Sequence, residues 1–140
     1  MVSPSESTGP VYVDSSVLVA LLATDDRHHQ LIRRWAGRAG SPLLTSVLAE
    51  VEVGRSLERR GAHSLLRTTF RRILYRLDLV DVTAAIRAAA IEVRPATVRS
   101  FDALHIATAL VAGVALFASL DARQRLAAEE MGLNPVPTRL

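Results

Sequence analysis

The stretch VYVDSSVLVALL, residues 11–22, limits what this chain can fold into more than any other segment. Three β-formers run straight into Asp14, which is followed by two serines and an unbroken apolar run. This order predicts a short buried strand over 11–13 that ends at Asp14 and turns directly into a helix. Ligands of open α/β sheets bind at the carboxyl ends of the strands. Asp14 is therefore either a cap for the next helix or part of a site.

The rest of the chain alternates predicted strands with predicted helices. Further strands are expected over 43–44, 76–82, 114–120 and, at an edge, 134–137. Helices are expected between them, over 26–36, 45–60, 63–76, 84–93, 101–113 and 122–131, with Ser100 capping the one that begins at 101. This alternation predicts an α/β protein, a three-layer α/β/α sandwich with a central parallel sheet of four to five strands. We expect one domain over 11–138, after a disordered leader over 1–10.

Arginine supplies all 17 basic residues, and the chain contains neither Lys nor Cys. Without Lys the chain cannot be a P-loop protein, and α/β phosphotransferases that use an Asp and a Lys are excluded as well. Without Cys it has no disulfide framework, thiolate metal site or cysteine nucleophile. The sequence shows no membrane span or secretion signal, so we expect a cytoplasmic protein without a membrane partner.

Several carboxylates fall where such a sheet could bring them together. Asp14 and Asp121 follow predicted strands, Asp102 lies at the start of an apolar helix, and Glu50 and Glu52 lie on the helix after the second strand. Each has a simpler explanation when taken alone: a helix cap, a favourable position near a helix N-terminus, or a solvated side chain. Together they indicate a site, because a carboxylate on the apolar helix of Asp102 is costly unless it is paired or binds a metal.

A group of carboxylates without thiolates suits Mg²⁺ or Mn²⁺, which prefer oxygen ligands. A metal ion in such a site activates water and stabilises charge on a leaving oxygen, which is the chemistry of phosphodiester hydrolysis. His105 lies one turn after Asp102 and is either a ligand, a general base or a packed, hydrogen-bonded histidine. The last of these is the favoured interpretation.

Four segments, in this order and spacing, resemble the PIN-domain ribonucleases and, more narrowly, the VapC toxins of type II VapBC toxin–antitoxin pairs. They are VYVDSSVLVALL, TSVLAEVEV, RSFDALHIATAL and FASLDARQRLA. The resemblance spans about residues 11–137. It implies a PIN-like fold and a Mg²⁺-dependent endoribonuclease, with Mn²⁺ as a possible substitute, that hydrolyses RNA with metal-activated water.

The resemblance also implies roles for particular residues. Asp14, Glu52, Asp102 and Asp121 match the acidic quartet of the family, with Asp14 and Asp102 as the principal metal ligands. Ser16 and Ser119 match small polar residues that support these acids. Glu52 is chosen over Glu50 by the family register alone. Residues two apart lie roughly 200° apart around a helix, so only one of the two can face the site.

The expected partners are RNA, a cognate VapB-type antitoxin and a second copy of the chain in a homodimer. The resemblance implies that the antitoxin binds near a predicted helical hairpin, which carries seven arginines: Arg55, Arg59, Arg60, Arg67, Arg71, Arg72 and Arg76. A charge-rich helix is usually only a solvated face. The alternative function is a catalytically inactive, PIN-like module that binds RNA or protein.

Overall fold

The central strand of the protein, β1 (Val11–Val13), is buried along its whole length, as its three β-formers predict. The computed structural model describes residues 9–39 and 42–140, so the leader expected over 1–10 lies almost entirely outside the described residues. β1 pairs in parallel with β2 (Leu43–Ser46) on one side and with β4 (Leu116–Ala118) on the other. The strand order is β3-β2-β1-β4-β5, and every pair is parallel.

Helices and the two edge strands complete the described part of the chain. In sequence order these elements are α2 (Ser15–Leu22), α3 (His29–Arg38), α4 (Val47–Arg59), α5 (Ser64–Arg76), β3 (Asp78–Val80), α6 (Ala84–Ile91), α7 (Ser100–Val111), α8 (Ala122–Glu130) and β5 (Asn134–Val136). None of the helices in this part is both long and apolar enough to cross a bilayer.

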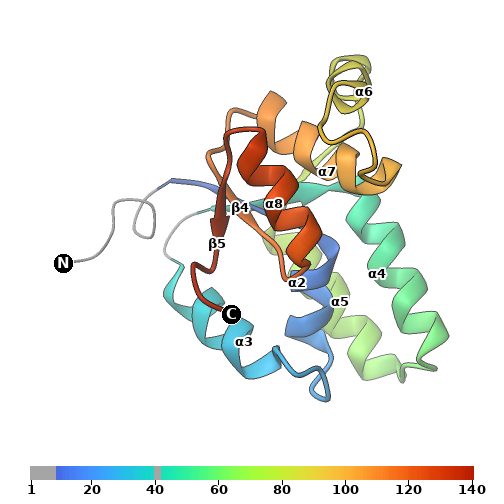
Figure 1. Cartoon of the computed structure of the whole chain (residues 1–140). Coiled ribbons are helices and arrows are strands. Elements are labelled where there is room, and N and C mark those ends of the chain that lie inside the picture. The colour runs from blue at the N-terminus through green and yellow to red at the C-terminus, as the bar shows by residue number, and fades with distance from the viewer. Residues whose placement is uncertain (1–8, 40–41) are drawn as a thin grey trace.

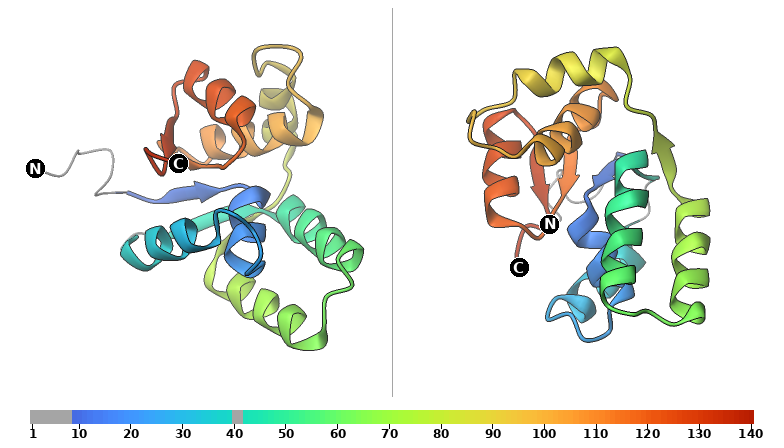
Figure 2. Two further views of the ribbon diagram at one scale, coloured as in Figure 1. Left: turned by 60° about the horizontal axis from the view of Figure 1, so that its bottom comes forward. Right: turned by 90° about the vertical axis from the view of Figure 1, so that its right-hand side faces the viewer.

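The helices cover both faces of the sheet, as Figure 1 and Figure 2 show. Side chains alternate between the two faces of a strand, and β1 supplies both cores in this way. Val11 and Val13 pack with residues of α2, α3, α4 and α5, whereas Tyr12 packs with Phe117 and residues of α6, α7 and α8. The prediction of a three-layer α/β/α sandwich with a parallel sheet is confirmed.

The strand order places a switch point between β1 and β4. From β1 the chain moves outward on one side to β2 and β3, and then crosses to the other side of β1 to form β4 and β5. In open α/β sheets, ligands bind outside the carboxyl ends of the two strands that flank such a point. Asp14 follows β1 and Asp121 lies close after β4, so both acids lie at this position.

Several boundaries differ from the predicted ones for identifiable reasons. The strand predicted from 114 begins only at Leu116, because the N–H of Val114 closes the end of α7 by bonding to Ala109 O. The helix predicted from 26 begins at His29, because Asp26 accepts the N–H of His28 and forms a turn. Ser100 is not a cap but the first residue of α7, whose N-cap is Arg99 without a side-chain hydrogen bond.

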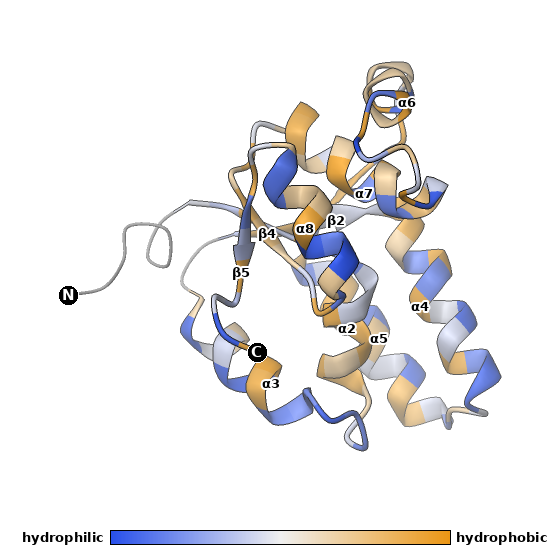
Figure 3. Ribbon diagram, viewed as in Figure 1, coloured by the Kyte–Doolittle hydropathy of each residue, from blue (hydrophilic) through white to orange (hydrophobic). Residues whose placement is uncertain are grey.

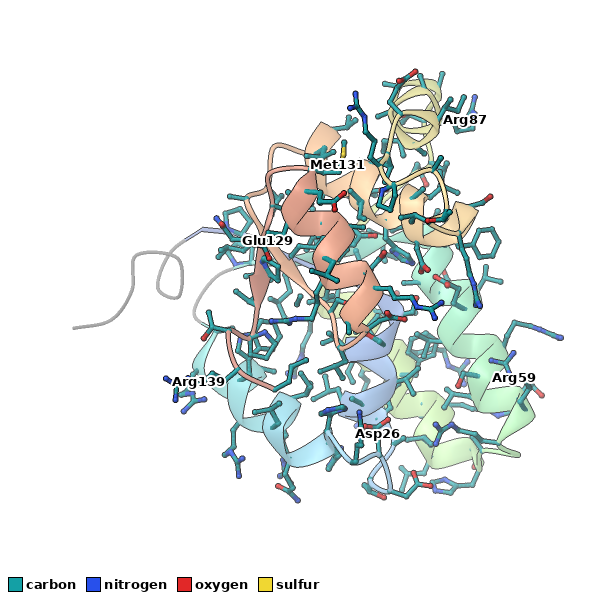
Figure 4. The ribbon with its side chains drawn as sticks, viewed as in Figure 1. Asp26, Arg59, Arg87, Glu129, Met131 and Arg139 are labelled. Carbon is teal, nitrogen blue, oxygen red and sulfur yellow. The ribbon has the colours of Figure 1, made fainter. Side chains whose placement is uncertain are left out.

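The hairpin formed by α4 and α5 presents its arginines on the outside of the protein. Hydrophilic and hydrophobic segments alternate along α4 (Figure 3), which is the pattern of a helix with one buried side. Arg59 lies on the outer side of α4 (Figure 4). Two of the seven arginines have acidic partners, since Arg67 pairs with Glu58 at 2.7 Å and Arg60 with Asp25 at 3.3 Å.

Candidate active site

Asp14 is both the N-cap of α2 and a buried carboxylate at the switch point. Its Oδ1 accepts the N–H of Ser16 at 3.0 Å and that of Val17 at 3.4 Å, so the capping interpretation is correct. The side chain is nonetheless only 5% exposed, and it also accepts the hydroxyl of Ser16 at 2.5 Å. Burial raises the pKa of Asp14, and the charge of His105 and the hydroxyl groups of Ser119 and Ser16 only partly oppose this.

The segment after β4 is joined to Asp14 through two serines. Ser16 Oγ accepts the N–H of Leu120 at 3.0 Å, and Ser119, fully buried, lies beside the Asp14 side chain and lowers its pKa. Ser119 Oγ also accepts the N–H of Asp121 at 3.1 Å. Asp121 in turn caps α8, accepting the N–H groups of Arg123 and Gln124. Ser16 and Ser119 therefore lie beside Asp14 and Asp121, and their role in supporting these acids stays a prediction.

Glu52, rather than Glu50, is the α4 acid that turns toward this edge. Its Oε1 accepts a hydrogen bond of 2.6 Å from Ser15 Oγ and one of 2.6 Å from His105 Nε2. Glu50 is exposed. Burial alone would raise the pKa of Glu52, but the hydrogen bonds from His105 and Ser15 outweigh burial and lower it below its usual range.

Asp102 projects from the first turn of α7 into a cavity of about 330 Å³. The cavity is lined by Thr97, Val98, Arg99, Asp102, Asp121, Ala122, Arg123 and Gln124. Burial raises the pKa of Asp102, and the negative charges of Asp121, Asp14 and Glu52 raise it further. These three acids are therefore close enough to Asp102 to repel it, so the four predicted carboxylates share one neighbourhood.

The atoms that could bind a metal ion at this edge are of the kind that a hard divalent cation prefers. They are carboxylate oxygens, together with Gln124 Oε1, which is buried and has no hydrogen-bond partner among the described residues. Within residues 9–39 and 42–140, however, no three Asp, Glu or His side chains are already arranged to hold a metal ion. An ion here would have to draw carboxylates from different elements together.

Comparisons with known proteins identify the family of this chain. The family model of the PIN domain matches residues 11–130. Ribonuclease VapC46 of Mycobacterium tuberculosis is 36% identical over 125 residues, which cover 88% of this chain and 93% of that protein. The chain belongs to the VapC family of PIN-domain ribonucleases. Ribonuclease VapC35 of the same organism is 31% identical over 130 residues, covering 90% of this chain and 95% of that protein.

Solved VapC structures share the fold. VapC20 of Mycobacterium tuberculosis, described as a toxin that cleaves the sarcin–ricin loop, superposes with a TM-score of 0.73 at 21% identity, covering 84% of this chain and 94% of that one. VapBC2 of Rickettsia felis, bound to a promoter DNA fragment, gives a TM-score of 0.68 at 11% identity, covering 91% and 97%. At these identities the superpositions establish the fold alone.

Some residues at this candidate site were not among the predicted ones. Ser15 and Tyr12 contact the predicted acids or their partners, and Arg99, Arg123 and Gln124 line the cavity. Their positions next to Asp14, Asp102 and Asp121 in the sequence are the one signal that could have singled them out. His105 is the packed, hydrogen-bonded histidine that the sequence favours: it is 1% exposed and uses both ring nitrogens.

Proposed function

We propose that this protein is a Mg²⁺-dependent endoribonuclease and the toxic component of a VapBC toxin–antitoxin pair. One observation carries the proposal: acids from four separate segments, Asp14, Glu52, Asp102 and Asp121, gather at the switch point of the sheet. The relatives named ribonucleases at 31–36% identity support the same reaction class.

The four acids would have different roles in binding the ion. Asp14 and Asp102 would be the principal ligands of Mg²⁺, or of Mn²⁺ in its place, and Glu52 and Asp121 would complete the site directly or through water. When bound, the ion would supply an activated water and stabilise charge on the leaving oxygen. Ser16 and Ser119 hold the Asp14 carboxylate in place through their hydroxyl groups.

Two arginines offset the negative charge that RNA meets here. Arg99 and Arg123 line the same cavity as Asp102 and Asp121. A guanidinium group binds phosphate oxygens with a planar fork of donors. Arg99 and Arg123 would therefore bind the phosphates beside the scissile one, while the acids act on the scissile phosphodiester.

The partner proposals follow from the family. Neighbouring folds include VapBC complexes such as VapBC-1 of nontypeable Haemophilus influenzae, which gives a TM-score of 0.67 at 9% identity. We assign this chain a VapB-type antitoxin that binds over the α4–α5 hairpin, which carries exposed arginines together with the exposed Tyr75 and Leu65. We also propose that the protein forms a homodimer and acts in the cytoplasm.

The decisive experiment compares the wild type with Asp14→Asn on an internally labelled RNA, with Mg²⁺ and with EDTA. The wild type should cut internal bonds only with the ion, and it should still cut an RNA with a 2′-deoxyribose at the cleaved position, because water is the nucleophile. Asp14→Asn should lose cleavage and keep or raise the melting temperature, since one buried charge is removed. Asp25→Asn, at an exposed aspartate, is the matched control.

Equal cleavage by Asp14→Asn and the wild type would contradict the assignment of the site. Salt-dependent RNA binding without cleavage, indifferent to Asp14→Asn, would instead favour the catalytically inactive binding module.

A further inference from the structure

A chain of hydrogen bonds runs from the core of the protein to the acidic edge. Tyr12 Oη and His105 Nδ1 are 2.5 Å apart, and His105 Nε2 lies 2.6 Å from Glu52 Oε1. Tyr12 and His105 are almost completely buried, whereas Glu52 is only partly buried. The chain joins residues of β1, α7 and α4, which lie far apart in the sequence.

The proton positions in this chain follow from its two ends. A carboxylate only accepts hydrogen bonds, so His105 Nε2 carries a proton and donates a hydrogen bond to Glu52 Oε1. At the other end, Tyr12 Oη accepts the N–H of Ser46 at 3.2 Å and can donate its own proton to His105 Nδ1. In this arrangement every donor and acceptor from Ser46 to Glu52 has a partner.

The same contacts leave one oxygen of Glu52 free. Ser15 Oγ and His105 Nε2 both bind Oε1. Within the described residues the structure gives Oε2 no hydrogen bond. Two donors on one oxygen fix the direction of the carboxylate, and the second oxygen is the one that remains for a cation.

A comparison with Thr108, another buried polar residue of α7, argues that His105 does more than fill space in the core. Thr108 satisfies its hydroxyl on its own helix, by donating to Leu104 O at 2.6 Å. His105 instead hydrogen-bonds Glu52, an acid of the candidate site, and its other ring nitrogen hydrogen-bonds Tyr12. Groups that hydrogen-bond metal ligands in this way set the direction of the ligand and its basicity.

We propose that His105 is a positioning residue that, held by Tyr12, fixes Glu52 so that Oε2 is presented to the divalent cation. The inference rests on the proposed function, because it concerns an acid of that same site. It assigns His105 no contact with RNA and no bond to the ion. Tyr12 acts one step further away, through the ring of His105.

Titration of the intact protein with Mn²⁺, followed by calorimetry or by the electron spin resonance of free Mn²⁺, tests this directly. His105→Leu should weaken Mn²⁺ binding by roughly 10- to 100-fold, as losses of groups behind metal ligands do. Tyr12→Phe, which removes one hydroxyl, should weaken it less. His105→Gln should recover part of the affinity, because its amide nitrogen can donate to Glu52.

Thr108→Val is the control, since it removes a buried hydrogen bond on the same helix and should leave Mn²⁺ affinity unchanged. In cleavage assays at limiting Mg²⁺, the His105 and Tyr12 variants should lose kcat and keep the KM for RNA. If His105→Leu does not fold, Tyr12→Phe and His105→Gln decide the matter.

Wild-type Mn²⁺ affinity in His105→Leu or in Tyr12→Phe would overturn the inference and leave the proposed function standing. A wild-type protein that binds no Mn²⁺ and cleaves no RNA would instead overturn the proposed function, and with it the reason for positioning Glu52.

Discussion

The backbone N–H of Leu120 donates a hydrogen bond of 3.0 Å to Ser16 Oγ, across 104 residues of sequence. The same hydroxyl donates to Asp14 Oδ1 at 2.5 Å. A single serine thus joins the segment after β4 to the carboxylate that follows β1. The two sides of the switch point are held together by a side chain of the candidate site itself.

Ser16→Ala should therefore weaken both stability and activity. The change leaves the Leu120 N–H without its partner and removes a hydrogen bond to a buried carboxylate. We expect the free energy of unfolding to fall by about 1–2 kcal/mol, measured by urea denaturation. Cleavage should fall as well, because Asp14 loses a donor that fixes it. Ser56→Ala on α4 is the control, and equal stability of the two variants would contradict this role of Ser16.

Asp102 should make the metal-free protein less stable as the pH rises. Its pKa is raised above the ordinary value of 3.8 in the folded state, so the folded state holds the proton more tightly than the unfolded state does. Stability is then lost as the pH rises from about 3.8 through the raised pKa. In EDTA, the melting temperature of Asp102→Asn minus that of the wild type should grow between pH 3 and 7. A constant difference would refute the raised pKa that burial and the neighbouring acids give Asp102.

Arg99 and Arg123 should contribute to RNA binding rather than to the chemical step. Changing both to Gln removes two cations from the cavity that contains Asp102 and Asp121. The KM for RNA should rise with little change in kcat, and the slope of log affinity against log salt should fall by about one per lost phosphate contact. Arg34→Gln, at an exposed position of α3, controls for net charge. An unchanged salt slope in the double variant would exclude phosphate binding at the cavity.

Arg125 should stabilise the fold next to the site. It donates to Ser119 O at 2.8 Å, to Val136 O at 3.1 Å and to Pro137 O at 2.6 Å, which joins the ends of β4 and β5. Arg125→Ala should lower the free energy of unfolding by about 2 kcal/mol, since hydrogen bonds from a charged donor are lost. Arg125→Lys should recover only part of this loss, because an ammonium lacks the planar fork. Full stability of the alanine variant in thermal unfolding would contradict this account.

The parts of the fold that follow from local pattern were predictable. The run from Val11 into Asp14 specifies a buried strand and a capped helix, and Asp121 repeats the pattern after β4. Parallel strands bring their carboxyl ends to one edge, so these acids could be expected together from the sequence. The ends of elements were less predictable, because contacts such as that of Val114 with α7 decide them.

The contacts of His105 could not be predicted from sequence. Its partners Tyr12 and Glu52 are 93 and 53 residues away, and nothing in a periodicity of apolar residues pairs them. The cavity arginines were missed for a related reason. The density of arginine along the sequence draws attention to the α4–α5 hairpin. Arg99 and Arg123 line one cavity because the starts of α7 and α8 are adjacent, where Gln124 Nε2 donates to Asp102 O.

The central claim is that acids from separate segments share one divalent cation at the switch point between β1 and β4. The most direct measurement is a crystal structure of the protein with Mn²⁺, in which anomalous scattering locates the ion. We predict Mn²⁺ bonded to oxygens of Asp14 and Asp102, with Glu52 and Asp121 bound directly or through water. Saturating Mn²⁺ with no ion at this edge, and Asp14 and Asp102 still apart, would contradict the account.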